Sequence, residues 1–141
     1  MSSTLSKTSR RVWVVINYLS LIMLIILYRF GHLKGWNVLI VVSLIVVFIL
    51  LQLSFTKLYK KTGLWKLVHT SVKELDEREI QLTHEALRYS YSIFVITCLL
   101  IIFIASILEI DMIIDVVSGV ALLYLAHTLP ASVIAWTERE V

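Results

Sequence analysis

The 141-residue sequence is poor in charge, proline, glycine and cysteine. Only 16% of its residues are charged and 59% are apolar, whereas a soluble domain averages about a quarter charged and about half apolar. This composition excludes a soluble globular enzyme, a disordered tail and a nucleic-acid-binding domain. The single cysteine, Cys98, excludes an intrachain disulfide. The sequence also lacks a glycine-rich phosphate loop, a nucleophile elbow and the H-E-x-x-H and C-x-x-C motifs, so we expect neither enzyme activity nor a cofactor.

What the sequence does contain is four long apolar runs. A bilayer span takes roughly 20 apolar residues, and the hydrocarbon offers no water to backbone groups, so spans are helices or closed barrels. The runs are continuous rather than alternating in polarity, which excludes barrel strands. We therefore predict an all-α, polytopic membrane protein, a single membrane domain over residues 1–141, with four transmembrane helices in two hairpins. The predicted spans are residues 12–28, 36–55, 91–108 and 112–136.

Lysine and arginine are distributed unevenly among the predicted loops. Of the 13 such residues, only Arg29 and Lys34 lie between the first two spans, and all others lie in the two tails and in residues 56–90. Because positively charged loops stay in the cytoplasm, we predict that both termini are cytoplasmic, in a bacterial cytoplasmic membrane. The net charge of +3 then reflects orientation, and no nucleic-acid partner is expected.

The predicted cytoplasmic segment, residues 56–90, begins with lysines interleaved with apolar side chains. A lysine near an anionic leaflet contributes about 1 kcal/mol of binding, so this half either binds lipid headgroups or serves only to fix the topology. The headgroup candidates are Lys57, Lys60, Lys61 and Lys66. We expect Gly63 to break the backbone here.

The second half of this segment has the pattern of a helix start. Ser71 and Glu74 have the spacing of a capping box. No glycine or proline occurs between Gly63 and Gly119, so we predict one helix over residues 71–108, about 57 Å long at 1.5 Å per residue. Its first part would project into the cytoplasm.

A short motif precedes the third predicted span. The run Asp76, Glu77, Arg78 and Glu79, followed by Ile80, Ala86 and Tyr89, resembles the D-E-R-[DE] signature of small uncharacterised prokaryotic four-helix membrane proteins. The resemblance implies topology and little else. Consecutive helix positions point in different directions, so these side chains are not expected to converge on one metal ion. They form either a solvated, salt-bridged face or a contact to a partner or second copy, across which Glu77 and Arg78 would pair.

A few polar residues fall inside the predicted spans. Asp115 is expected at the outer interface, because a carboxylate at mid-span costs roughly 2.5–3.5 kcal/mol and usually marks a pathway or a partner. His127, close to Pro130, is expected to hydrogen-bond inside the bundle; it is the only histidine in a span, so we expect no metal or haem site within one subunit. Asn17, Gln52 and Ser54 are candidates for hydrogen bonds between helices. The predicted packing face of the fourth helix consists of Ser118, Gly119, Leu122 and Ala126.

These patterns favour a non-enzymatic integral membrane protein that acts by association, as an accessory subunit of a membrane complex or as a homo-oligomer. Two alternatives stay open. One is a small oligomeric transporter or channel that uses Asp115 and His127, and the other is a membrane-surface sensor that uses the basic loop. The expected partners are the lipid bilayer and either other membrane subunits or further copies of the chain.

Overall fold

The computed structural model describes residues 5–107 and 115–138, and every regular element in them is helical. The main helices are α1 (Lys7–Lys34), α2 (Val38–Phe55), α3 (Leu64–His69), α4 (Glu77–Ile107) and α5 (Val116–Thr137). A π-helical turn, Thr56–Lys60, continues α2, and a 3-10 turn, Val72–Glu74, precedes α4. Helices α1, α2, α4 and α5 are each long and apolar enough to cross a membrane, in agreement with the four predicted spans.

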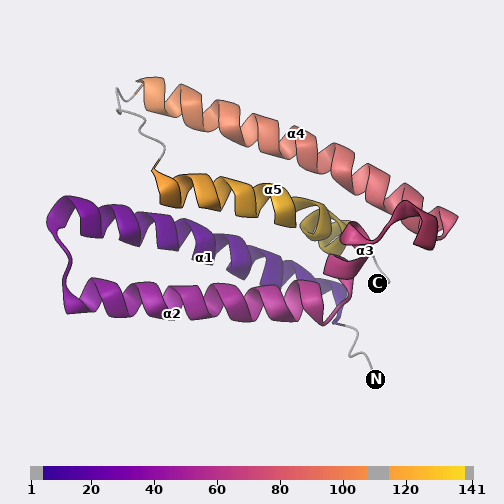
Figure 1. Cartoon of the computed structure of the whole chain (residues 1–141), viewed down its shortest axis with the longest axis horizontal. Coiled ribbons are helices and arrows are strands. Elements are labelled where there is room, and N and C mark those ends of the chain that lie inside the picture. The colour runs from indigo at the N-terminus through magenta and orange to yellow at the C-terminus, as the bar shows by residue number, and fades with distance from the viewer. Residues whose placement is uncertain (1–4, 108–114, 139–141) are drawn as a thin grey trace.

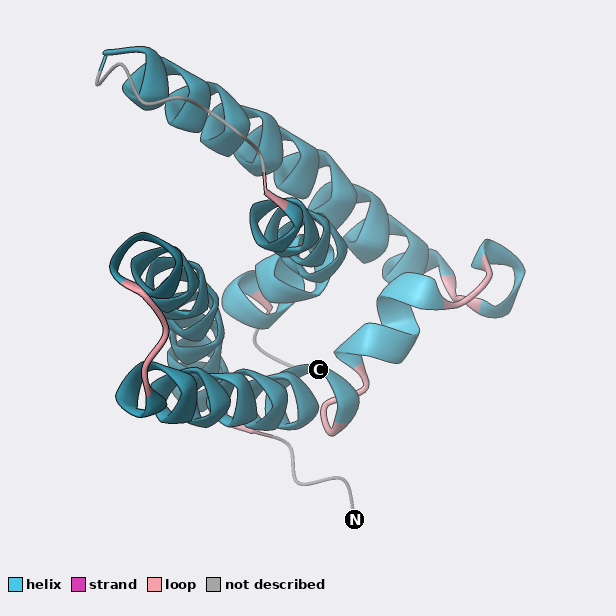
Figure 2. Ribbon diagram, turned by 60° about the vertical axis from the view of Figure 1, so that its left-hand side comes forward, coloured by secondary structure: helices cyan, strands magenta, loops and turns pink. Residues whose placement is uncertain are grey.

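Helix α5 lies in the middle of the molecule. The α1–α2 pair packs on one side of α5, and α4 packs on the other, as Figures 1 and 2 show from two directions. The short helix α3 lies against α5 and the π turn. We call the end where α1 begins and where α2, α3 and α5 finish the basic end of the bundle (right in Figure 1).

Side-chain caps start three of the long helices. Ser6, Asn37 and Asp115 each accept the backbone N–H three residues further on, at 3.2, 2.9 and 2.7 Å. Such caps satisfy donors that have no partner within the helix. Helix α1 ends before Gly35, whose φ of +91° lies in the region where a residue without Cβ is not strained.

Helix α4 starts later than the sequence pattern suggests. Ser71 makes no capping bond, and the residues after it form the 3-10 turn. The capping box is instead built by Asp76 and Glu79: the Glu79 N–H donates to Asp76 Oδ1 at 2.7 Å, and the Asp76 N–H donates to Glu79 Oε2 at 3.1 Å. The prediction of a helix beginning at residue 71 is therefore wrong. Helix α4 has 31 residues, about 46 Å at 1.5 Å per residue, and residue 108 lies outside the described part.

The best-packed part of the core lies near the basic end. The first residues of the predicted cytoplasmic segment belong to it, because the π turn directs Leu58 and Tyr59 inward, where both are fully buried. Leu64, at the start of α3, is also fully buried. The break at Gly63 is confirmed, since this residue has φ +79° and separates the π turn from α3. The cluster is completed by Val14, Ala86, Ala131, Ile134 and Ala135.

Candidate functional site

The D-E-R-E motif divides into two structural roles. The side chains of Asp76 and Glu79 are occupied in the capping box that starts α4. Arg78 reaches across to the end of α5, where its guanidinium lies 3.9 Å from a carboxylate oxygen of Glu138. Glu77 is exposed on the first turn of α4. Glu77 and Arg78 are both exposed, and the Arg78 side chain is 74% exposed, so both are accessible to a second molecule.

The four predicted headgroup lysines are all exposed at the basic end. Lys57 lies over the ring of Trp13, with its ammonium 4.6 Å from the ring centroid, a cation–π contact that attaches the π turn to α1. Lys60, Lys61 and Lys66 are exposed, whereas the neighbouring Leu58, Tyr59 and Leu64 are fully buried in the core. This arrangement leaves three ammonium groups in position to meet a charged surface.

Asp115 is a helix cap at the end opposite the basic end. Its Oδ1 accepts the Ser118 N–H at 2.7 Å, and its Oδ2 lies 3.7 Å from the guanidinium of Arg29 on α1. The hydrogen bonds from Ser118 lower the pKa of this carboxyl below its ordinary value, and the nearby charges of Arg29 and His32 act in the same direction. Asp115 therefore begins α5 and links it to α1.

His127 lies within α5 and contacts α3. Its ring stacks on His69 with centroids 5.9 Å apart and on Trp65 with centroids 6.4 Å apart. The His127 residue is exposed, and its described contacts are these ring contacts rather than the hydrogen bond inside the bundle that the sequence suggested. The stack of Trp65, His69 and His127 holds α3 against the side of α5.

The predicted packing residues of α5 are only partly covered. Ser118, Gly119, Leu122 and Ala126 are half-buried. The most deeply buried stretch of α5 is further along, around Thr128, Ala131, Ser132 and Ala135, where the helix meets α1, the π turn and α4. Small side chains do mark this contact, but the stretch with the closest packing follows His127 instead of preceding it.

Two groups of hydrogen bonds join side chains of different helices in the described part of the bundle. In the first, Asn17 on α1 donates to Ser54 Oγ on α2 at 2.8 Å and to Tyr124 Oη on α5 at 2.9 Å. This confirms the expectation for Asn17 and Ser54. Gln52 is exposed and takes no part. Asn17 is fully buried, and its side-chain amide joins α1 to both α2 and α5.

The second group centres on Ser132 of α5. Its Oγ lies 2.7 Å from both Tyr18 Oη on α1 and Tyr59 Oη on the π turn. The Ser132 hydroxyl itself donates to the Thr128 carbonyl at 2.9 Å, so both tyrosines donate to it. The sequence positions of these tyrosines and this serine do not predict the network, because it depends on which faces of α1, the π turn and α5 pack together.

The basic start of α1 binds the last carbonyls of α5. The bonds run from Lys7 to Thr137 O at 2.7 Å, from Arg10 to Glu138 O at 2.8 Å and from Arg11 to Trp136 O at 3.2 Å. A helix C-terminus carries carbonyls with no partner in the helix and a partial negative charge, which cations stabilise. These three side chains, considered above only for orientation, therefore also join the first and last helices. Arg10 is 1% exposed despite its charge.

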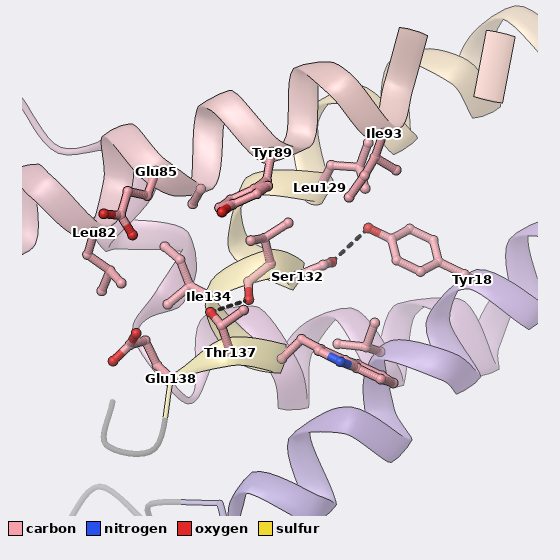
Figure 3. Close-up of a pocket in the computed structure, with 14 residues that line it drawn as sticks. Tyr18, Leu82, Glu85, Tyr89, Ile93, Leu129, Ser132, Ile134, Thr137 and Glu138 are labelled. Carbon is pink, nitrogen blue, oxygen red and sulfur yellow. Dashed lines mark hydrogen bonds between the residues drawn. The ribbon is translucent and has the colours of Figure 1, made fainter. Parts of the chain in front are cut away.

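An open groove of about 600 Å³ lies between α1, α4 and α5 at the basic end (Figure 3). Its α4 wall is formed by Leu82, Glu85, Ala86, Tyr89 and Ile93, which recur at helical spacing along one face. Val14 and Tyr18 of α1 face them, and α5 forms the floor. The lining is mostly apolar, with Glu85 and Glu138 as its two ionisable carboxylates. This groove is the most developed candidate site, and sequence reasoning missed it because three helices that are distant in sequence form it.

No cluster of three or more metal-ligating side chains occurs among residues 5–107 and 115–138. No protein-family model, curated protein or solved structure matches this chain. The resemblance of residues 76–79 to the four-helix signature therefore stays a prediction.

Proposed function

We propose that the protein is a non-enzymatic integral membrane protein that acts by association, through the part of α4 that extends beyond the bilayer. In this proposal the helices form two membrane-spanning hairpins, and the basic end faces the cytoplasm. The partner is a second copy of the chain or another subunit of a membrane complex.

The observation that carries the proposal is the length and exposure of α4. At about 46 Å it exceeds the roughly 30 Å hydrocarbon thickness by about 16 Å. The excess matches the charged first turns, where Glu77, Gln81, His84 and Arg88 are exposed. Only one side of α4 is covered, by α5 and α3. A capped helix with exposed residues on its outward face is a suitable surface for another helix or domain.

The orientation is supported by the positions of the charges. The exposed lysines and the basic start of α1 gather at the basic end, whereas Arg29 and Lys34 lie at the opposite end. Positively charged residues flanking spans favour the cytoplasmic side. The projecting turns of α4 would then lie in the cytoplasm.

Cross-linking in native membranes tests the association. In a Cys98→Ser background, a Glu77→Cys variant treated with a short bis-maleimide should give one discrete product larger than the monomer. A Lys61→Cys variant, exposed at the same end but directly after the π turn, is the matched control and should give little. A monomer from both variants, together with a single-chain mass in mild detergent, would contradict the proposal.

The transporter alternative has less support from the geometry. Asp115 and His127 are about 18 Å apart along α5 at 1.5 Å per residue. One caps the helix start and the other stacks on α3, so they do not face a common path. The described hydrogen bonds that join side chains of different spans use amide and hydroxyl groups instead of charged ones.

A further inference from the structure

The groove between α1, α4 and α5 has the dimensions of an alkyl chain. Along α4 it runs from Leu82 to Ile93, about 16 Å at 1.5 Å per residue. A volume of about 600 Å³ over that length corresponds to a cross-section of about 36 Å², roughly 7 Å across. These dimensions suit one extended alkyl chain.

The lining changes character along the groove. Away from the basic end the walls are Ile93, Leu129 and Val14, with the hydroxyls of Tyr18 and Ser132 already bonded to each other. Toward the basic end the groove passes Tyr89 and ends between Glu85 and Glu138, which Figure 3 shows beside Leu82. An occupant thus meets apolar surface first and carboxylates at one end.

The charges at that end favour a cation. Both charged lining groups are carboxylates, and within the described residues Glu138 lies 3.9 Å from Arg78, whose side chain is 74% exposed. Lys7 and Arg10 do not line the groove, and both donate to carbonyls at the end of α5. An anionic headgroup in the same place would be repelled by two carboxylates.

We propose that this groove binds a single alkyl chain of an amphiphile with an ammonium headgroup, which enters from the lipid through the gap between α1 and α4. The ammonium lies between Glu85 and Glu138 and the chain lies along the face of α4 that carries Ala86 and Ile93. This ligand site lies on the face of α4 turned toward α1 and α5, whereas the proposed association uses the outward face of the same first turns.

Electron spin resonance of spin-labelled chains in nanodiscs of zwitterionic lipid tests the proposal. The probes are one dodecyl chain ending in trimethylammonium and the same chain ending in sulfonate. The ammonium probe should show a motionally restricted component that saturates near one probe per protein, with affinity about fivefold to tenfold above that of the sulfonate probe. Equal restriction of the two probes would overturn the proposal.

Two pairs of variants separate the chain from the headgroup. Val133→Phe fills the groove and should abolish the restricted component, whereas Leu123→Phe, on an exposed part of α5 outside the groove, should leave it intact. Glu85→Gln should reduce the preference for ammonium about threefold to tenfold, and the exposed control Glu74→Gln should not. If Val133→Phe instead changes the oligomeric mass and leaves probe binding unaltered, the groove is a contact between chains and the proposal fails.

Discussion

At the level of single residues, the polar side chains of the spans differ by whether another helix presents a partner. Asn17 is fully buried and bonds to Ser54 and Tyr124, whereas Gln52, two residues before Ser54, is exposed. Both are amides in apolar runs, so the sequence alone does not distinguish them. The difference is set by which side of α1 and α2 faces α5.

Replacing Asn17 with leucine should therefore lower the stability of the bundle. Hydrogen bonds between transmembrane helices contribute about 0.6 kcal/mol on average, and the buried partners left without Asn17 add to the loss. We expect the free energy of unfolding in mixed micelles to fall by about 1–2 kcal/mol. The matched variant Gln52→Leu should change it by less than about 0.5 kcal/mol, and an equal effect of the two would show that the Asn17 network does not stabilise the fold.

Asp115 allows a test that depends on pH. Its pKa is lowered in the folded protein, chiefly by hydrogen bonds from Ser118, so the ionised form stabilises the fold. That contribution is complete above the ordinary pKa of 3.8 and is lost as the pH falls through the lowered value. The stability difference between wild type and Asp115→Asn, which keeps a capping oxygen, should shrink below pH 3.8.

The variant Asp115→Ala removes the cap as well as the charge. It should cost about 1 kcal/mol even at low pH, and thermal unfolding from pH 3 to pH 7 would measure both variants. If the stability difference between wild type and Asp115→Asn grows as the pH falls, the ionised form of Asp115 does not stabilise the fold.

At the level of elements, the long apolar helices are predictable from sequence and their junctions are not. Hydropathy identifies the four spans because bilayer thickness sets a minimum apolar length. The start of α4 was mispredicted because two overlapping pairs, Ser71 with Glu74 and Asp76 with Glu79, share the capping spacing. Only the second pair forms the reciprocal bonds. The π turn that buries Tyr59 likewise follows from packing against Ser132 rather than from a local pattern.

The two candidate starts of α4 can be compared by mutation. Asp76→Ala should destabilise the first turn of α4 by about 1 kcal/mol, because it removes the acceptor for the Glu79 N–H. Ser71→Ala should have almost no effect. Hydrogen exchange of the amides of residues 79 and 80 would report the change, and faster exchange in Ser71→Ala than in Asp76→Ala would place the helix start where the sequence first suggested.

At the level of the whole molecule, α5 joins parts that are distant in sequence. Its end is bound by the basic start of α1, its Ser132 by Tyr18 and Tyr59, and its other side by α4. The groove exists because α4 rests on α5 and not on α1, an arrangement that no periodicity in either helix reveals. The sequence therefore predicts how many spans there are, whereas the candidate ligand site requires knowledge of how they pack.

The account depends most on four helices crossing the bilayer with the basic end in the cytoplasm. Labelling of single cysteines in intact cells by a membrane-impermeant maleimide, in a Cys98→Ser background, tests this most directly. Lys34→Cys should react from outside, and Lys61→Cys should react only after the membrane is permeabilised. Reaction of Lys61→Cys in intact cells, with Lys34→Cys protected, would contradict the account.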